Sequence, residues 1–388
     1  MAPTDILMTK PRIHLSIAHP TGKEEQFISE ALKSNWITTQ GPQVVQFEKE
    51  LKAYLGIDNP IVLVNSGTAA IHLGLIELGV QPGDDVICQD LTFVASVNPV
   101  QYLGANPIFV DSEKDTWNIS PEFLETAIVE RIKKTGKTPK AIVPVNLYGM
   151  PALWPEILQI AEKYSIPVLE DAAEALGSHI LINGEKKFCS TLGYTGVISF
   201  NGNKVITTAG GGALVCPNEE FAQHIRHIAS QARDKVPFYQ HSELGYNYNL
   251  SNISAALGIA QIENLQKYVD RRRKIHFLYR SELSVVPGIE FQNEREGTFS
   301  NYWLTCILFE SYETREAVRK YLEAKNIESR PLWNPMHLQP FYKDYAFFGT
   351  NVGESLFQRG LCLPSGSILD DEDVLRVCSL IKKCLNII

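Results

Sequence analysis

A lysine in an otherwise neutral turn is the residue of this sequence best placed for covalent chemistry. Lys204 follows an apolar run, Val197–Phe200, and the three glycines 210–212 lead into a second apolar run, Ala213–Val215. The pattern predicts a hairpin-like pair of short strands with Lys204 in the connection. The sequence neighbours carry no charge to pair with the lysine, and the glycines clear space for a ligand. Burial would lower the pKa of Lys204, whose free amine can then form a Schiff base.

Two carboxylates follow another apolar run and complete the predicted site. Residues 166–169 run into Glu170 and Asp171, and Glu174 follows three residues later. The carboxyl ends of strands in α/β sheets face the ligand crevice. Pyridoxal phosphate needs a lysine for its Schiff base and an acid that keeps its pyridine nitrogen protonated. Lys204 and Asp171 are therefore predicted to bind this cofactor.

A strand, a turn of small residues and a helix near the start of the chain predict a place for the cofactor's phosphate. Ile61–Val64 is a short apolar run, and residues 65–68, Asn-Ser-Gly-Thr, lead into a helical pattern that begins at Ala69. The free N–H groups and the positive dipole end of a helix attract a phosphate. The same turn is often only an N-cap, so this signal alone is weak.

Strand and helix patterns alternate at the spacing of βαβ units from residue 61 to residue 171. This alternation predicts an α/β fold, with a mostly parallel central sheet and helices on both faces. The chain has neither a GxGxxG after the first strand nor a GxxxxGK[ST], which argues against a dinucleotide or P-loop fold. The predicted organisation is an N-terminal arm (1–24), a large domain (25–265), and a linking helix with a smaller α+β domain (266–388).

Composition narrows the class of protein further. The 388 residues are 44% hydrophobic and carry a net charge of −8, enough for one large core with a smaller domain. The basic residues are scattered, which argues against nucleic-acid or anionic-membrane partners. Seven cysteines without a CxxC pair predict free thiols rather than a metal site or disulfides. Without a signal peptide or membrane span, a cytoplasmic protein is expected.

Seven ordered segments carry a family resemblance: Gly41-Pro42 with Phe47-Glu48, residues 65–70, Thr92-Phe93, residues 170–174, residues 199–212, residues 245–248, and Arg330-Pro331 with His337. Through them the chain resembles, over essentially its whole length, the pyridoxal phosphate-dependent sugar-nucleotide aminotransferases of the DegT/DnrJ branch of fold type I. Any one segment would be unspecific. Their order and spacing together make the resemblance specific.

The resemblance implies a role for each candidate residue. Lys204 would be catalytic and bind the cofactor covalently, and Asp171 would pair with the pyridine nitrogen. The other implied cofactor contacts are Thr68, Ala69 and Ser199 at the phosphate, Phe93 against the ring, Glu174 near the 3-hydroxyl group, and Asn247 from a second subunit. Implied substrate contacts are Arg330, His337 and Asn249, the last standing where the family often has arginine. The site would then be shared across a homodimer, and no metal is expected. Taken singly, Phe93, Glu174, Asn247 and His337 would more often be structural.

The resemblance also implies a reaction. Lys204 favours transamination, because relatives with histidine at this position dehydrate their substrate instead. L-glutamate would convert the cofactor to pyridoxamine phosphate, which would then aminate a nucleotide-linked keto sugar for a cell-surface glycan. Segments such as 231–233, 330–333 and 361–366 are most similar to enzymes that aminate C4 of UDP-linked 2-acetamido-4-keto-2,6-dideoxyhexoses, as in N-acetylbacillosamine synthesis.

Three alternatives remain open at the level of the sequence. The segment Pro-Met-His-Leu-Gln-Pro (335–340) is shared with enzymes of the perosamine synthase type, which use GDP-linked 4-keto-6-deoxymannose. A 3-keto sugar is the second alternative. A protein of a different class, which binds pyridoxal phosphate without turnover and acts as a regulator, is the third. No DNA-binding helix pair or basic stripe supports this last reading.

Overall fold

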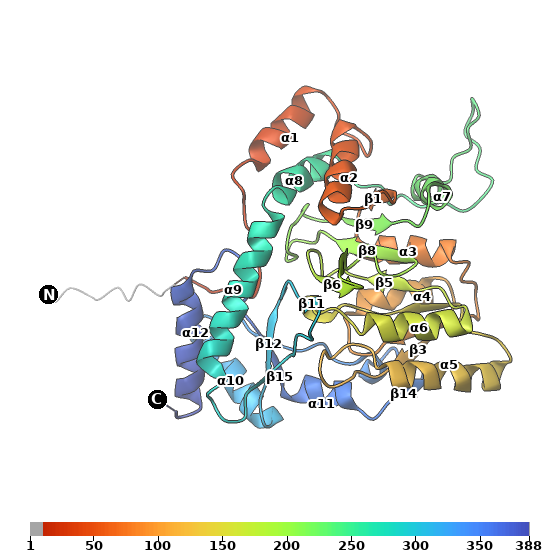
Figure 1. Cartoon of the computed structure of the whole chain (residues 1–388). Helices are drawn as coiled ribbons and strands as arrows, with labels where there is room; N and C mark the ends of the chain where they lie inside the picture. Colours follow the sequence, from red (N-terminus) through yellow and green to blue (C-terminus); the bar gives the residue numbers. More distant parts are fainter. Residues whose placement is uncertain (1–10, 388) are drawn as a thin grey trace.

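The computed structural model describes residues 11–387 and is built around one central sheet (Figure 1). Its strand order is β1-β9-β8-β5 followed by β4-β2-β3-β14, the two halves being joined by parallel bridges from Ile142 to Val168 and from Val145 to Asp171. Only β9 runs antiparallel to its neighbours. The predicted mostly parallel α/β fold is confirmed. The strands are β1 Ile61–Val64, β2 Asp85–Gln89, β3 Asn106–Val110, β4 Ala141–Val143, β5 Leu169–Asp171, β8 Thr195–Ser199, β9 Gly212–Val215 and β14 Phe347–Phe348.

Helices cover both faces of this sheet because alternate side chains of each strand point to opposite sides. In β1, Val62 packs with α3 and α7, whereas Leu63 packs with α2 and α8 on the other face. In β2, Ile87 packs with α5 and α6, whereas Val86 faces α3. The helices are α2 Pro42–Leu55, α3 Gly67–Glu77, α4 Asn98–Tyr102, α5 Pro121–Thr135, α6 Trp154–Tyr164, α7 Glu219–Ala229 and α8 Asn252–Ile262.

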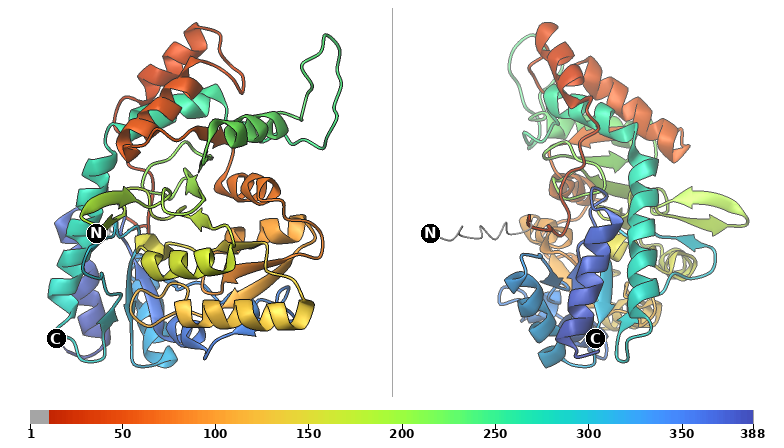
Figure 2. Two further views of the ribbon diagram at one scale, coloured as in Figure 1. Left: turned by 45° about the vertical axis from the view of Figure 1, so that its right-hand side comes forward. Right: turned by 90° about the vertical axis from the view of Figure 1, so that its left-hand side faces the viewer.

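The long helix α9, Leu265–Leu283, leads to the C-terminal unit and runs beside α12 (Figures 1 and 2). A second sheet of order β10-β12-β15-β13 packs with these helices around its own core. Its elements are β10 Glu290–Phe291, β12 Thr305–Leu308, β13 Arg330–Pro331, β15 Gly360–Leu363, α10 Tyr312–Ala324, α11 Val352–Arg359 and α12 Asp371–Cys384. The separated strands and helices expected here are present.

Two C-terminal strands nevertheless pair with the first part of the chain. Besides β14, which extends the central sheet beside β3, strand β11 (Thr298–Phe299) pairs with β6 (His179–Ile182). Strand β6 in turn forms a hairpin with β7 (Glu185–Phe188). Asn183 and Gly184 at its tip both have positive φ, 52° and 80°, as an Asn-Gly hairpin turn requires. The chain after residue 265 therefore also helps to build the large unit.

The first described residues, from 11 onward, pack against the C-terminal unit. The predicted arm, 1–24, lies partly outside the described residues, but Ile13 forms a parallel bridge with Ile327, and the first helix, α1, spans Glu24–Lys33. Residues 94–102 do not form one continuous helix but a 3-10 turn, Val94–Ser96, followed by the short α4. Pro99, which lacks an N–H group, lies in the first turn of α4 and explains the interruption.

Within residues 11–387, no helix is both long and apolar enough to span a membrane. The same residues hold no cluster of histidine, cysteine and carboxylate side chains suited to a metal ion. All seven cysteines lie in this described part and are free, six of them buried.

Candidate active site

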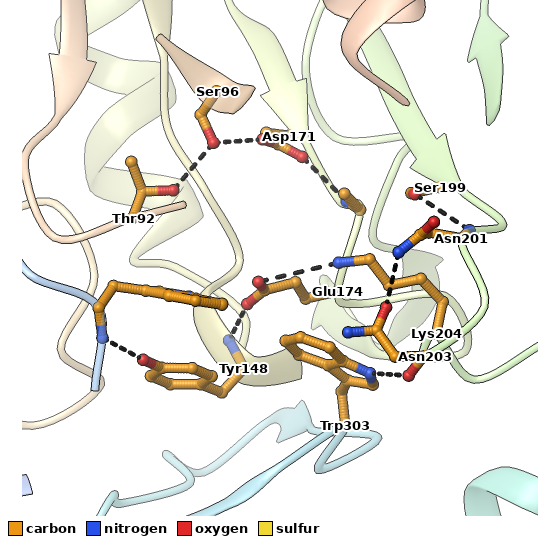
Figure 3. A network of polar contacts seen from close by, with 12 residues as sticks. Thr92, Ser96, Tyr148, Asp171, Glu174, Ser199, Asn201, Asn203, Lys204 and Trp303 are labelled. Atoms are coloured by element: carbon orange, nitrogen blue, oxygen red, sulfur yellow. Dashed lines mark hydrogen bonds and ion pairs between the residues drawn. The ribbon is translucent and has the colours of Figure 1, made fainter. Parts of the chain in front are cut away.

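One cavity of about 340 Å³ lies at the carboxyl ends of β1, β5 and β8. It contains six of the predicted site residues, namely Thr68, Phe93, Asp171, Glu174, Ser199 and Lys204. Its other walls include Asn65, Ser66, Gly67, Thr92, Ser96, Asn201, Asn203, Gly210, Gly211, Trp303 and Trp333. Figure 3 shows how the polar side chains converge there. The sheet therefore brings together residues that are far apart in the sequence.

Lys204 lies in the loop between the antiparallel strands β8 and β9, whose pairing of Ser199 with Gly212 confirms the expected hairpin-like arrangement. Its side chain is 13% exposed, and its Nζ atom lies 3.9 Å from Oε1 of Glu174 and 4.2 Å from the ring centroid of Trp303. Burial lowers the pKa of Lys204, and the charge of Glu174 opposes this effect. The sequence neighbours of Lys204 are neutral, but Glu174 approaches its amine from another segment.

Asp171 ends β5 and is buried at the base of the cavity. Ser96 Oγ donates to its Oδ2 atom at 2.7 Å, and the main-chain N–H of Ala173 donates to Oδ1 at 3.0 Å. The hydroxyls of Thr92 and Ser96 lie 2.9 Å apart and extend this network (Figure 3). Burial raises the pKa of Asp171, against the hydrogen bond from Ser96. A cationic pyridine nitrogen of the bound cofactor would face this carboxylate and lower the pKa of Asp171.

Glu174 is buried on the side of the cavity beside Lys204. The main-chain N–H of Tyr148 donates to its Oε2 atom at 2.6 Å. Burial raises the pKa of Glu174 to about 7, against the charge of Lys204. Tyr148 has a positive φ of 56°, and its hydroxyl oxygen accepts from the main-chain N–H of Trp333 at 2.8 Å. Sequence reasoning missed Tyr148 and Trp303, since no local pattern marks them, and it included Trp333 only as part of the segment 330–333.

The other end of the cavity is the N-terminus of α3. Ser66 caps this helix, and its Oγ atom accepts from the N–H of Ala69 at 3.0 Å. The N–H groups of Gly67 and Thr68 precede any intrahelical acceptor and are available to an anion. A Cβ atom on Gly212 would lie 2.6 Å from the nitrogen of Gly67, so only glycine lets β9 pass the helix start this closely.

The donor set fits pyridoxal phosphate. The N-terminus of α3 suits the phosphate, Asp171 suits a protonated ring nitrogen, and Lys204 supplies a buried amine. The indole of Trp333 lies on the wall close to Glu174, whose pKa its N–H group lowers. Of the three glycines, Gly210 leaves open space, its nearest atom to a Cβ being 3.9 Å away, whereas Gly211 and Gly212 pack against neighbouring atoms.

Five predicted residues do not line this cavity within the chain. The main-chain oxygen of Asn247 accepts from the side chain of Asn65, and Asn249 borders another hollow beside α2. Arg330 is exposed and pairs with Glu328 at 2.9 Å. His337 Nδ1 lies 2.7 Å from Oδ2 of the buried Asp90. Their roles in cofactor or substrate binding remain predictions. That of Ala69 does too, because its N–H already donates to the cap.

The chain is similar to known aminotransferases over nearly its whole length. The profile described as the DegT/DnrJ/EryC1/StrS aminotransferase family matches residues 20–382. EpsN of Bacillus subtilis (strain 168), named as a pyridoxal phosphate-dependent aminotransferase, is 45% identical over 374 residues, 95% of each chain. A protein of Escherichia coli O157:H7 named GDP-perosamine synthase is 36% identical over 363 residues, 94% of this chain and 96% of its own.

Solved structures share the fold. Spr1654 from Streptococcus pneumoniae, named as a sugar aminotransferase, superposes in its PLP form with a TM-score of 0.88 and 27% identity. The alignment covers 97% of this chain and all of that chain. The PMP form of the same protein gives a TM-score of 0.87, with 26% identity over 96% of this chain and 99% of that one.

Proposed function

Since the chain belongs to the DegT/DnrJ/EryC1/StrS aminotransferase family, we propose that it transfers an amino group from L-glutamate to C4 of a UDP-linked 2-acetamido-4-keto-2,6-dideoxyhexose. At the coarser level, the chain is a sugar aminotransferase with pyridoxal phosphate as its cofactor. One observation carries the proposal: the buried amine of Lys204 and the buried carboxylate of Asp171 share one cavity with a helix N-terminus.

Different residues of the chain would have different roles in transamination. When bound, pyridoxal phosphate supplies an electron sink for the bonds of the substrate carbon. Lys204 would take a proton from the α-carbon of glutamate and later deliver one to the sugar carbon, as a general base and acid. Asp171, fixed by Ser96 and Ala173, would keep the ring nitrogen protonated. Free N–H groups at the start of α3 would hold the phosphate.

Aromatic side chains at the cavity support a sugar as the acceptor. Phe93 is 48% exposed at the wall, and its ring lies 5.1 Å from that of Trp333. Trp333 stacks in turn on Tyr148. Flat apolar faces suit both the cofactor ring and the C–H faces of a hexose. The predicted contact of Phe93 with the cofactor is therefore compatible with its position.

A homodimer is the proposed assembly. The loop between α7 and α8 projects from the body of the chain (Figures 1 and 2). Phe238, Tyr239 and Leu244 on it are 61%, 80% and 77% exposed, and such apolar side chains suit burial against a second copy. The same loop ends at Asn247, which the family resemblance assigns to the partner's cofactor. Arg330 would contact the sugar or its diphosphate, whereas His337 is held by the buried Asp90.

A GDP-linked 4-keto-6-deoxymannose is the second candidate acceptor. Its support is the relative named GDP-perosamine synthase, which aligns over nearly the whole chain. A 3-keto sugar would have to bind in a different orientation, with C3 rather than C4 of its ring beside Lys204. A regulator that binds the cofactor without turnover is the alternative of another class, and the free buried amine of Lys204 favours catalysis over it.

The proposal is tested by turnover with purified protein, pyridoxal phosphate and L-glutamate. Formation of 2-oxoglutarate, and bleaching of the cofactor's visible absorbance, would separate an enzyme from a regulator. The two 4-keto sugar nucleotides are then offered separately at equal concentration. A higher kcat/KM for amino-sugar formation with the UDP sugar supports the proposed acceptor. A higher kcat/KM with the GDP sugar replaces it by the second candidate.

A further inference from the structure

Trp303 contacts both Lys204 and Asn203, the residue before it. The face of its indole ring lies under the amine, with 4.2 Å from Nζ to the ring centroid. Its indole N–H donates at 2.7 Å to the main-chain oxygen of Asn203, the residue that precedes Lys204 (Figure 3). The side chain is 2% exposed and lines the cavity. One tryptophan from the C-terminal half of the chain therefore contacts the amine of Lys204 and the main chain at Asn203.

The turn that carries Trp303 is tied to the segment that carries Glu174. The Oδ1 atom of Asn301 accepts from the main-chain N–H of Trp303 at 2.8 Å. Its Nδ2 atom donates to the main-chain oxygens of Glu174 and Leu176, at 3.0 and 2.9 Å. Tyr302, between them, has a φ of 45°, a conformation that a bulky residue adopts only when its surroundings enforce it. These hydrogen bonds fix the turn that carries Trp303 relative to the segment that carries Glu174.

The oxygen of Asn203 receives a second donor from the N-terminal part of the chain. Ser16 Oγ donates to it at 2.9 Å, and Arg272 Nη2 donates to Ser16 Oγ at 3.1 Å. The Nη1 atom of Arg272 donates to the main-chain oxygen of Trp303 at 2.7 Å. Arg272 is 1% exposed and belongs to α9. The main-chain oxygen of Asn203 therefore accepts from two distant parts of the chain. The donors are the hydroxyl of Ser16 and the indole N–H of Trp303.

We propose that Trp303 is a positioning residue for Lys204. Its N–H, with the hydroxyl of Ser16, fixes the main chain at Asn203, and its ring face holds the amine in the cavity when the amine is not joined to the cofactor. This inference rests on the proposed role of Lys204. An aromatic face attracts an ammonium group but offers no lone pair that would trap it. The amine therefore stays close to the reacting carbon without being sequestered in a tight ion pair.

The test measures how fast cofactor-free protein captures pyridoxal phosphate, followed by visible absorbance across a pH series. Capture requires the neutral amine, so the rate rises with pH around the pKa of Lys204. The charged groups that face the amine, Glu174 and Asp171, stay in place in every variant. Trp303→Leu removes both contacts, Trp303→Phe keeps an aromatic face but loses the N–H, and Ser16→Ala removes only the second donor. Trp117→Leu, which removes another buried indole, controls for loss of packing.

Trp303→Leu is expected to move the midpoint of this profile to lower pH, because the ring face favours the charged amine. Its plateau rate should fall about 10- to 100-fold, as expected for a misplaced reacting group. Trp303→Phe and Ser16→Ala should lower the plateau while keeping the wild-type midpoint. Trp117→Leu should change the melting temperature but neither feature of the profile.

The inference is overturned if Trp303→Leu keeps the wild-type midpoint and plateau, or if Trp117→Leu alters the profile in the same way. Failure of the proposed function gives a different result. Wild-type protein would then show no capture that depends on Lys204, which the Lys204→Ala variant reveals in the same experiment.

Discussion

The amine of Lys204 lies 3.9 Å from a carboxylate oxygen of Glu174, and both side chains are largely buried. Burial raises the pKa of Glu174 to about 7 and lowers that of Lys204. The protonation of Glu174 therefore changes near neutral pH, where the negative charge beside the amine is either present or absent. A glutamine at position 174 would keep the shape of the side chain but remove this dependence.

Replacing Glu174 by glutamine should change how the stability of the cofactor-free protein depends on pH. The folded pKa of about 7 exceeds the unfolded value of about 4.3, so the contribution of Glu174 is complete below pH 4.3. It is lost as the pH rises through 7. At 1.36 kcal/mol per pKa unit the wild type should lose up to about 4 kcal/mol that Glu174→Gln retains.

Urea unfolding at pH 5 and pH 8 measures this difference. The variant should gain stability relative to the wild type between the two pH values. Glu185→Gln, at an exposed position of the β6–β7 hairpin, is the matched control and should show no such gain. Equal differences at both pH values would show that Glu174 does not titrate in this range.

Lys204→Ala should abolish covalent capture of the cofactor. The buried amine is the proposed nucleophile that joins the chain to the cofactor. As a positioned acid–base group it would also contribute about 10²- to 10⁴-fold to the rate of transamination. Intact mass after borohydride reduction should show the added cofactor on the wild-type chain and not on the variant. Lys187→Ala, which removes an exposed lysine paired with Glu185, should retain the full mass shift. An undiminished shift in Lys204→Ala would assign the covalent link to another lysine.

Asp171→Asn should bind the cofactor but lower kcat by about 10²- to 10³-fold, because a neutral amide cannot keep the ring nitrogen protonated. Ser96→Ala leaves the carboxylate and removes the hydrogen bond at 2.7 Å, so it should cost about 10-fold, as for one bond to a charged group. Single-turnover rates with L-glutamate measure both effects. A wild-type rate for Asp171→Asn would contradict the assignment.

His337→Ala should act mainly on stability. The imidazole is the partner of Asp90, a carboxylate with 0% exposure, and removing one member of a buried pair costs roughly 3 to 5 kcal/mol. Burial lowers the pKa of His337, but the hydrogen bond and charge of Asp90, with the charges of Asp111 and Glu354, together raise the pKa overall. Urea unfolding should show the loss, with KM for the sugar nucleotide changed less than about twofold. Unchanged stability with a raised KM would instead support the contact with substrate that the sequence predicts.

The parts of the site that follow local patterns could be predicted from the sequence. Short stretches of the sequence predict the strand that ends at Asp171, the hairpin-like loop that holds Lys204 and the turn before α3. Trp303, Tyr148 and Ser96 could not be found in this way, because tertiary packing alone brings them to the cavity. The same is true of β14, which crosses back from the C-terminal unit. The Asn183-Gly184 turn was a local signal for the missed β6–β7 hairpin.

The most direct test of the central claim is a single turnover of the amino group. Purified protein is loaded with pyridoxamine phosphate and mixed with the UDP-linked 4-keto sugar or its GDP-linked counterpart. The cofactor's visible absorbance and the mass of the sugar nucleotide are followed together. We predict one equivalent of amino sugar per loaded site, formed faster with the UDP sugar, and none in Lys204→Ala. Absence of amino sugar with both acceptors, from protein that retains its cofactor, would contradict amination of a 4-keto sugar nucleotide.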